Sequence, residues 1–455
     1  MKKIISVFAA AALLGTLCAC EDKPSRSEPV GDVTVPAVTE SPTEPAYLEL
    51  TEEDFAPVDM VQEITDGTPS AVHCTELEGV DFGERLSPCK APDECEKYSP
   101  RTIFEGYPDI QAQYDRERQA KLETPFKGRT DTVVCLGGKL YFAVNFDDLC
   151  SRHDSSVFRY DPATKETTEL VRREGLEYDG GFASLCAVHG RLFFTENAKS
   201  ETPHTTICEI DPESGNVSEL LSLDTNVYSL RESADGLLMT CYDGGDASAY
   251  YKEYVLETKE IRDYNTESTR FTALLCDGVP AEITGGFDGE KYEPITVKTQ
   301  YYTISTDITH YSGIFLWRDK VCIAVNDHIG GDWLYTYDIA NRERLKMKFG
   351  GFISGLIKAG DALACVSQSG VNSDSYSTLY YIEPTLGAIH RIGKESSLVM
   401  ANGGDKQAFV ITFRHADENV NFSGMTGSES SNGNGSVSFW TSEATVPDKL
   451  YTFGE

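Results

Sequence analysis

Loops that combine carboxylates, amides and aromatic rings recur along this chain, and they are where its chemistry is expected. They follow short apolar segments and read Asn145-Phe146-Asp147-Asp148, Glu196-Asn197, Asp243-Gly244-Gly245-Asp246, Asp327-His328-Ile329-Gly330-Gly331-Asp332-Trp333, Asn372-Ser373-Asp374 and Arg414-His415-Ala416-Asp417-Glu418. Aromatic rings offer a π face and carboxylates take hydroxyls or positive charge, so such loops suit a sugar or a cationic ligand. The ligand-binding candidates are Asp147, Asp148, Asp243, Asp327, His328, Asp332, Trp333 and His415. Asp, Asn and Gly are also common turn residues, so turn formation alone would explain most positions.

Short catalytic or metal-binding motifs of fixed spacing are absent from the sequence. It contains no Gly-x-Ser-x-Gly, no His-Glu-x-x-His, no Walker loop and no EF-hand loop. Gly393-Lys394-Glu395-Ser396 has the wrong glycine spacing for a phosphate loop, and Glu395 replaces the Ser or Thr that would bind magnesium. We therefore predict no catalytic residue, no metal site and no cofactor.

Ten of the 13 cysteines fall into two groups. Those with apolar neighbours are predicted to be small buried hydrophobes, namely Cys135, Cys186, Cys208, Cys241, Cys276, Cys322 and Cys365. Cys89 and Cys95 lie in a Pro-rich stretch and form a disulfide candidate, which needs an oxidising compartment. Two alternatives remain open there: free thiols, and a zinc site with His73 and Cys74 that would lack a Cys-x-x-Cys pair.

An internal repeat predicts the elements that position the polar loops. Its first half is an apolar strand, a tight turn and a second apolar strand, most clearly in Val133 to Phe142. Similar hairpins occupy Ser184 to Phe194, Tyr228 to Met239, Ile314 to Val325, Gly355 to Val366 and Leu398 to Ile411. The second half is a strand that runs into a turn, often Asp-Pro, as in Phe158 to Thr164, Cys208 to Gly215, Leu334 to Ala340 and Tyr380 to Gly387. Each unit therefore predicts four antiparallel strands.

Units of four strands at a spacing of about 40 to 50 residues are typical of β-propeller blades. We count seven, beginning near residues 130, 182, 226, 270, 311, 353 and 396, with six or eight left open because the fourth is weak. The Asp-Pro turns resemble those of bacterial propellers with YVTN-type or quinoprotein-type repeats. This resemblance covers about 70% of the chain and implies an all-β propeller architecture, without implying a chemistry.

The blades extend over residues 130–455, with two irregular regions at or near their ends. Residues 47–129 do not fit the repeat and are predicted to be an irregular or helical extension, either a cap or a lead-in strand packed on the ring. Residues 421–436, rich in Gly, Ser and Asn, are predicted to be a flexible loop within the last blade.

Residues 1–19 have the pattern of a signal peptide. Lys2-Lys3 precede an apolar run from Ile4 to Leu17 that is too short to cross a bilayer, which needs roughly 20 residues. Leu17-Cys18-Ala19-Cys20 then resembles the lipobox of bacterial lipoproteins, with small Ala19 just before the cleavage point. This resemblance implies an exported chain, acylated on Cys20 and held at the extracytoplasmic face of a cell membrane.

Residues 20–46 are rich in Pro, Ser, Thr and Glu and are predicted to be a disordered tether. The chain as a whole is strongly acidic, with 73 Asp and Glu against 40 Lys and Arg and a net charge of −33. This charge argues against binding nucleic acid, whose phosphates are neutralised by Lys and Arg. It also argues against attraction to anionic lipids, so membrane contact is expected through the anchor on Cys20.

The sequence favours a binding or protein-interaction module that meets an extracellular ligand or partner protein. In a propeller the loops between second and third strands share one face, so the candidate residues would form an acidic, partly aromatic rim. An enzyme that hydrolyses or cleaves carbohydrate is the alternative, with Asp147, Asp327, His328 and His415 as candidates. A component of envelope assembly is the third.

Overall fold

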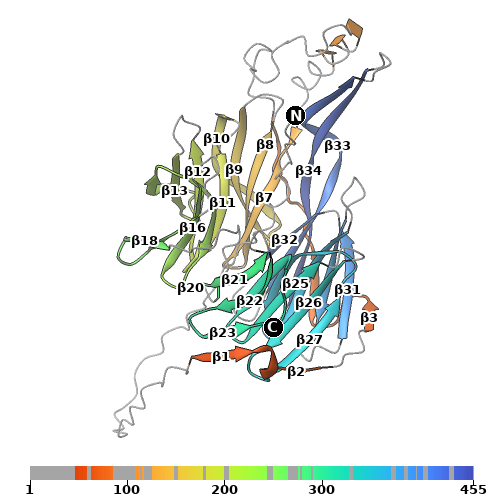
Figure 1. The fold of residues 1–455 in the computed structure, drawn as a ribbon. Coiled ribbons are helices and arrows are strands. Elements are labelled where there is room, and N and C mark those ends of the chain that lie inside the picture. The colour runs from red at the N-terminus through yellow and green to blue at the C-terminus, as the bar shows by residue number, and fades with distance from the viewer. Residues whose placement is uncertain are drawn as a thin grey trace.

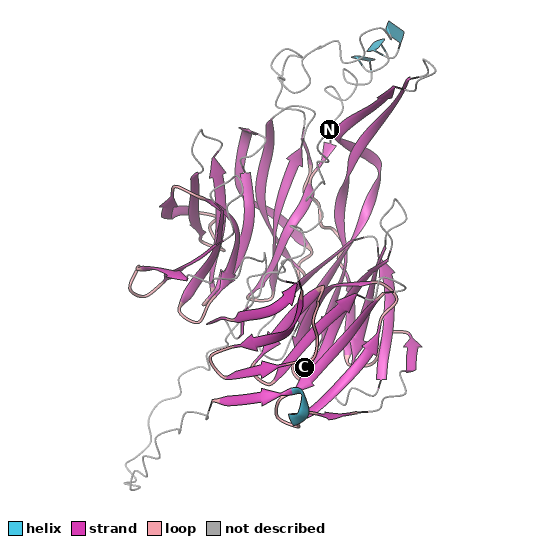
Figure 2. Cartoon of the chain, in the orientation of Figure 1, coloured by secondary structure: helices cyan, strands magenta, loops and turns pink. Residues whose placement is uncertain are grey.

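The computed structural model describes residues 47–58, 63–85, 108–109, 111–112, 115–116, 126–147, 152–177, 181–198, 204–242, 250–264, 275–276, 279–287, 291–326, 331–369, 376–383, 388–395, 397–402, 408–429 and 435–453. Their regular structure is almost entirely β-strand (Figure 2). Helix is confined to the single turn η2, Glu52–Asp54, and to short pieces at 108–109, 111–112 and 115–116. None of the helices in these ranges has the length and apolarity needed to span a membrane.

The strands form a seven-bladed β-propeller of four-stranded antiparallel sheets, which confirms the predicted fold class (Figure 1). The first three blades comprise β7 (Arg129–Leu136), β8 (Lys139–Asp147), β9 (Arg152–Asp161) and β10 (Glu166–Glu177); β11 (Gly181–Val188), β12 (Arg191–Ala198), β13 (His204–Ile210) and β14 (Val217–Leu223); and β15 (Asn226–Glu232), β16 (Gly236–Tyr242), β17 (Tyr250–Val255) and β18 (Ile261–Tyr264). The blades begin close to the residues that the repeat predicts.

Blades 5 to 7 follow the same plan. They comprise β24 (Gly313–Trp317), β25 (Lys320–Asn326), β26 (Asp332–Asp338) and β27 (Glu343–Lys348); β28 (Phe352–Ala359), β29 (Ala362–Ser369), β30 (Tyr376–Ile382) and β31 (Ala388–Glu395); and β32 (Ser397–Asn402), β33 (Ala408–Glu429) and β34 (Gly435–Phe453), completed by β4 (Val72–Glu76).

Blade 4 is the unit whose sequence signal is weak, and its first hairpin is short. β19 (Leu275–Cys276) pairs with β20 (Val279–Pro280), and only Ala281 separates β20 from β21 (Glu282–Phe287). β20 and β21 thus act as one interrupted second strand, followed by β22 (Tyr292–Lys298) and β23 (Tyr302–Ser305). The interruption explains why the repeat is hard to recognise there.

Continuous apolar runs form the inner strands because both faces of a blade are covered by its neighbours. In β8 every side chain from Leu140 to Val144 is buried, and β25 shows the same pattern. Buried clusters join consecutive blades: one spans blades 1 to 3, and others join blade 4 to 5, 5 to 6, 6 to 7 and 7 to 1. Gly137-Gly138, both with positive φ, form the kind of two-residue turn that suits the twist of such hairpins.

Residues 47–58 and 63–76 form a belt along the outer edges of four blades. β1 (Leu48–Thr51) pairs in parallel with β23, β2 (Ala56–Pro57) with β27, and β3 (Glu63–Asp66) with β31. In Figure 1 these orange-red strands lie at the lower edge and the right side of the molecule. The belt therefore adds an outermost strand to blades 4, 5 and 6.

The last strand of the belt closes the ring. β4 pairs antiparallel with β34, from Val72 opposite Phe453 to Glu76 opposite Lys449, and supplies the fourth strand of blade 7. The chain then crosses to blade 1, where Leu77, Val80 and Phe82 are buried against its strands. It ends this path in β5 (Glu84–Arg85), which pairs with β6 (Phe126–Lys127).

A long ribbon occupies the described part of residues 421–436, where composition predicts a flexible loop. β33 and β34 remain paired far beyond the other strands of blade 7, with Asn421 opposite Ser442 and Ser428 opposite Ser436. The ribbon, residues 414–429 and 435–446, projects from the ring in dark blue in Figure 1. Val, Phe and Trp residues between positions 420 and 440 favour extended strands, and they outweigh the Gly and Ser content that suggested a loop.

The belt's packing on the ring can be measured through Phe55. Its ring is 3% exposed and meets Tyr337 edge to face at 5.1 Å. We expect Phe55→Ala to lower the free energy of unfolding by about 3 to 5 kcal/mol, because it leaves a cavity under the belt. Ile64→Ala, at a belt position that is 38% exposed, should cost less than about 1 kcal/mol. Urea unfolding followed by tyrosine and tryptophan fluorescence compares the two, and equal effects would contradict a packed belt.

Candidate functional site

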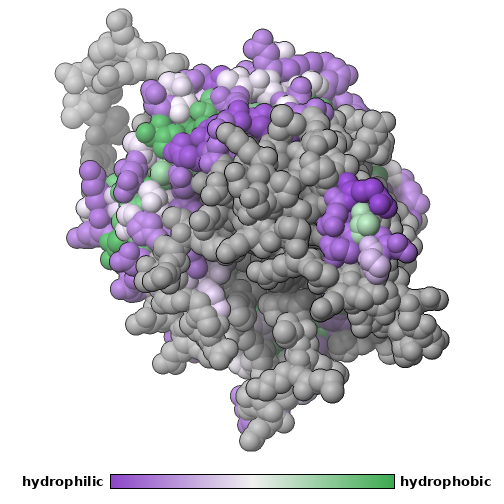
Figure 3. Space-filling model, turned by 90° about the horizontal axis from the view of Figure 1, so that it is seen from above, coloured by the Kyte–Doolittle hydropathy of each residue, from purple (hydrophilic) through white to green (hydrophobic). Residues whose placement is uncertain are grey.

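Each blade begins its first strand, and joins its second strand to its third, at the same end of the ring. We call this end the loop face; in blade 1 it is where β8 ends at Asp147 and β9 begins at Arg152. The ribbon rises from it, so Figure 3, which looks down from above Figure 1, views this side. The described residues visible there are mostly hydrophilic, with a few hydrophobic patches.

Of the predicted rim residues, only Asp332 and Trp333 have described side chains. The backbone of Asp147 ends β8, and that of His415 pairs with Thr445 at the base of the ribbon, so both belong to the loop-face end of their blades. The remaining predicted positions lie outside the described residues, namely Asp148, Asp243, Asp327 and His328, and so do Cys20, Cys89 and Cys95.

Asp332 joins two blades and is buried, although the sequence places it on a solvent-facing rim. Its side chain has no exposed surface, and its Oδ2 accepts hydrogen bonds from Ser312 Oγ at 2.8 Å and from the Ile353 amide at 2.9 Å. Ile353 is the second residue of β28 in the next blade. The carboxylate thus satisfies the buried Ile353 amide across the boundary between blades 5 and 6, and it also accepts from the Ser312 hydroxyl within blade 5.

Thr205 performs the same function between blades 2 and 3. It lies near the start of its blade's third strand, like Asp332, and its Oγ1 accepts from the amide of Val227, the second residue of β15, at 3.0 Å. The Thr205 hydroxyl also contacts Asn197 Oδ1 at 2.7 Å, so this predicted loop amide helps to hold the same junction. Short polar side chains at this position therefore act as latches between blades.

Trp333 has its aromatic surface occupied by the protein's own cations. The ammonium of Lys346 lies 4.2 Å from the ring centroid and that of Lys348 lies 4.9 Å from it. Both lysines come from β27, where Lys348 is opposite Trp333 in the register. The protein's own lysines thus make with Trp333 the kind of cation–π contact that the sequence predicts for a cationic ligand.

Exposed aromatic residues that the sequence analysis does not single out lie at the loop face. Tyr228 is 50% exposed and its ring lies 5.6 Å from that of Tyr242, while Tyr292 is 60% exposed and lies 6.2 Å from His310. Phe352 is 47% exposed at the start of β28. Each of these three rings falls within the first three residues of a strand. An aromatic directly after a loop is the sequence signal that could have identified them.

Ion pairs hold carboxylates on blades 1 and 2 near the same face. The Nε of Arg173, on β10, lies 3.1 Å from both carboxylate oxygens of Glu196, at the end of β12. Arg172 contacts Asp154, whose side chain is buried, at 3.5 Å. Acidic groups that look free in the sequence are thus partly neutralised by neighbouring strands.

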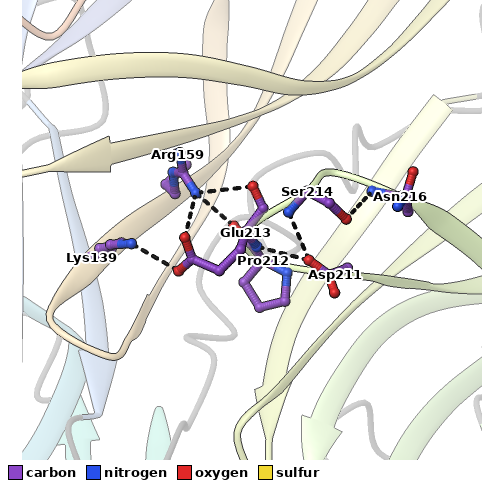
Figure 4. Close-up of polar contacts among 7 residues, drawn as sticks. All are labelled: Lys139, Arg159, Asp211, Pro212, Glu213, Ser214 and Asn216. Carbon is purple, nitrogen blue, oxygen red and sulfur yellow. Dashed lines mark hydrogen bonds and ion pairs between the residues drawn. The ribbon is translucent and has the colours of Figure 1, made fainter.

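The opposite end of the ring holds tight turns, and these also connect blades. In the Asp211-Pro212 turn of blade 2, Asp211 accepts hydrogen bonds from the amides of Glu213 and Ser214, which hold its pKa below the usual value (Figure 4). Two cations of blade 1 reach this turn: Lys139 contacts the Glu213 carboxylate at 2.8 Å, and Arg159 donates to the Pro212 carbonyl at 2.9 Å. The predicted Asp-Pro turn is confirmed, and it serves as an inter-blade contact.

All seven cysteines predicted to be buried are buried. Burial raises the pKa of the Cys208 thiol to about 11 and that of Cys322 to about 12, so both stay protonated and unreactive at neutral pH. Among the described residues no group of His, Cys, Asp and Glu is arranged to hold a metal ion. Of the zinc alternative, His73 and Cys74 lie on β4, and the other two residues fall outside the described ranges.

Several solved structures are similar to this chain, but the comparisons assign it to no protein family. No protein-family model and no curated protein matches the chain. Similar solved structures include a prolyl endopeptidase, at 11% identity over 77% of this chain and 56% of that one, with a TM-score of 0.45. The β-propeller domain of the Trilobed protease from Pyrococcus furiosus has 12% identity over 70% of this chain and 97% of that domain, with a TM-score of 0.44. TolB from Acinetobacter baumannii has 13% identity, 70% and 64% coverage, and a TM-score of 0.33.

The chain therefore spans 56% of the length of that prolyl endopeptidase. Sequence identities of 11 to 13% to these structures bear on the fold alone and carry no statement about function. The seven blades are established by the strand pairing of this chain itself.

The latch role of Asp332 predicts a loss of stability on substitution. Asp332→Ala leaves the Ser312 hydroxyl and the buried Ile353 amide without their acceptor, and the unsatisfied buried amide alone costs about 1 to 3 kcal/mol. Asp332→Asn keeps one acceptor oxygen and should lose less, while Asp361→Ala, at an exposed turn, should change stability by less than about 0.5 kcal/mol. Thermal and urea unfolding of the three variants makes the comparison. An Asp332→Ala protein with unchanged stability would show that the carboxylate does not hold the blades together.

Proposed function

We propose that this protein is a membrane-anchored extracytoplasmic lipoprotein whose propeller binds a ligand or partner protein at the loop face. The observation that carries the proposal is the set of exposed rings at this face, Tyr228, Tyr292 and Phe352. Burying a side chain of this size is worth about 1.5 to 3 kcal/mol, so keeping three of them exposed at one end forgoes stability that folding could have gained. Exposed aromatics on a rigid scaffold are typical contact residues of binding surfaces.

The chemistry of these rings suggests what would bind. Two of the three are tyrosines, whose hydroxyl can exchange hydrogen bonds while the ring packs against an apolar surface. His310 beside Tyr292 adds a second polar ring to one of the two aromatic pairs. A glycan or the surface of a partner protein, each of which offers apolar patches among polar groups, fits this combination.

The anchor extends the proposal to location. Acylation of Cys20 would join the chain to the membrane, and residues 20–46 would separate the lipid from the belt, which begins at residue 47. A Pro-rich tether of this kind is extended, so the ring would be held away from the headgroups with its loop face accessible. The carbohydrate-cleaving enzyme stays an alternative that no described side chain favours. Of its four candidates, Asp327 and His328 lie outside the described residues, and only the backbone of Asp147 and His415 is described.

Binding at the loop face predicts that tyrosine substitutions abolish ligand recognition without unfolding the ring. On glycan and peptide arrays, Tyr228→Ser combined with Tyr292→Ser should lose the signals that the unchanged protein gives, with stability altered by less than about 1 kcal/mol. Ile64→Ser combined with Ile261→Ser removes exposed apolar side chains from the outer edge and serves as the matched control. If both pairs retain every signal, the loop-face aromatics are not the binding surface.

The anchor is tested separately in a bacterial host. Cys20→Ser should abolish incorporation of a clickable palmitate analogue and release the chain from the membrane fraction, because no acyl acceptor remains. Cys18→Ser should leave both unchanged, since Leu17 before it would be a poor cleavage position. Labelling that persists in Cys20→Ser and disappears in Cys18→Ser would move the anchor to the other cysteine.

A further inference from the structure

The belt demonstrates how the outer edges of this propeller accept an extended peptide. In blades 4, 5 and 6 the outermost strand of the blade pairs in parallel with a short belt segment. An outer strand has one row of backbone donors and acceptors that its own blade does not use, and such an edge is a template for another strand. Here the same chain uses this template three times.

Charge complementarity accompanies two of the three contacts. In blades 5 and 6 acidic belt residues meet basic residues of the receiving strands: Glu52 forms an ion pair with Arg344 of β27, and Asp66 contacts Arg391 of β31 at 2.6 Å. In blade 4 the receiving strand β23 has no charged residue. Past the belt, Glu78 pairs with Lys165 in the turn before β10 of blade 1, where Asp81 and Gly79 also bond to Thr167. The outer edges of blades 4, 5, 6, 7 and 1 are thus in contact with residues 47–85.

The outer edge of blade 2 has the opposite charge. β14 is the last strand of its sheet in the described part of the chain, and it is longer than the strands that receive β1 to β3, except β31. No Lys or Arg occurs between residues 205 and 230. Glu219 is exposed in the middle of β14, and Asp224, just after it, is 98% exposed and 3.4 Å from His204. Leu220, Leu221 and Leu223 are only partly buried.

We propose that the outer edge of blade 2 binds an extended, basic segment of a partner protein, which adds to β14 in parallel as a fifth strand. The backbone pairing is that of β1, β2 and β3, and the charges are reversed, with Lys or Arg of the partner facing Glu219 and Asp224. Blade 3 is less suited because its outer strand β18 carries a cation, Arg262, which is engaged with Asp235 at 2.6 Å. This surface lies on the circumference of the ring, so it is distinct from the loop face and independent of the function proposed there.

Two synthetic peptides test this inference: one of the length of β14 in which lysine alternates with valine, and its glutamate counterpart. Binding to the intact ectodomain is followed by fluorescence anisotropy at physiological salt. We expect the basic peptide to bind and the acidic one not to bind. Glu219→Lys combined with Asp224→Lys should lower the affinity for the basic peptide by about tenfold, because two attractions become repulsions. The same variant should allow the acidic peptide to bind.

A net charge of −33 attracts any basic peptide, so the control must make the same change of charge elsewhere. Glu257→Lys combined with Asp361→Lys alters two exposed acidic residues in hairpin turns of blades 3 and 6, and should leave the affinity of the basic peptide within about twofold. Hydrogen exchange supplies the second readout: the basic peptide should slow exchange of β14 amides in the unchanged protein. Equal losses in the two double variants, or protection confined to other blades, would overturn the proposal.

Discussion

Pairing of residues 72–76 with residues 449–453 is the constraint on which the rest of the structure depends. Without it blade 7 has three strands, its outer edge is open, and the buried cluster that joins blade 7 to blade 1 loses Leu77, Val80 and Phe82, which follow β4 directly. The entropic cost of bringing such distant segments together grows only slowly with chain length. Four further outer-edge contacts along residues 47–85 then share that cost, because once β4 is in place its neighbours in the chain are already beside the blades they cover.

The same arrangement determines where a mechanical force from a membrane anchor would act on the ring. Under the proposed acylation of Cys20, the tether leads first into β1, then β2 and β3, and only afterwards into the closing strand β4. A pull from the membrane would therefore act on the parallel outermost strands, which are accessory to their blades, before it reached the strand that closes the ring. The Glu52 and Asp66 ion pairs lie on this path ahead of β4. The order of elements in the sequence thus protects closure from mechanical disturbance.

Sequence patterns sufficed where structure depends on local composition, and failed where it depends on a distant partner. Val133 to Phe142 was predictable because an apolar run, a Gly-Gly turn and a second run specify a buried hairpin without outside help, and the burial of Cys135 and Cys322 follows from the same runs. The belt was not predictable. Its strands are two to five residues long, too short for an apolar-polar alternation to be recognised, and their partners lie hundreds of positions away. Asp332 illustrates the limit for the site. A carboxylate between two glycines and a tryptophan suits either a rim or a latch, and only the position of Ile353 in the next blade decides between them.

The two ends of the ring differ in how much their connections can vary, and this difference favours the loop face for the proposed binding surface. At the end of the ring opposite the loop face, two-residue turns such as Gly137-Gly138 leave no room for insertion. The Asp211 turn at the same end is fixed by Lys139 and Arg159 of the neighbouring blade. Changes there would disturb contacts between blades. At the loop face the connections are longer, as between Tyr242 and Tyr250, and the latches Thr205 and Asp332 lie just below them and hold the strands in register. A loop above such a latch can change in length and chemistry without loosening the ring, so a binding surface can evolve at this end with little cost to stability.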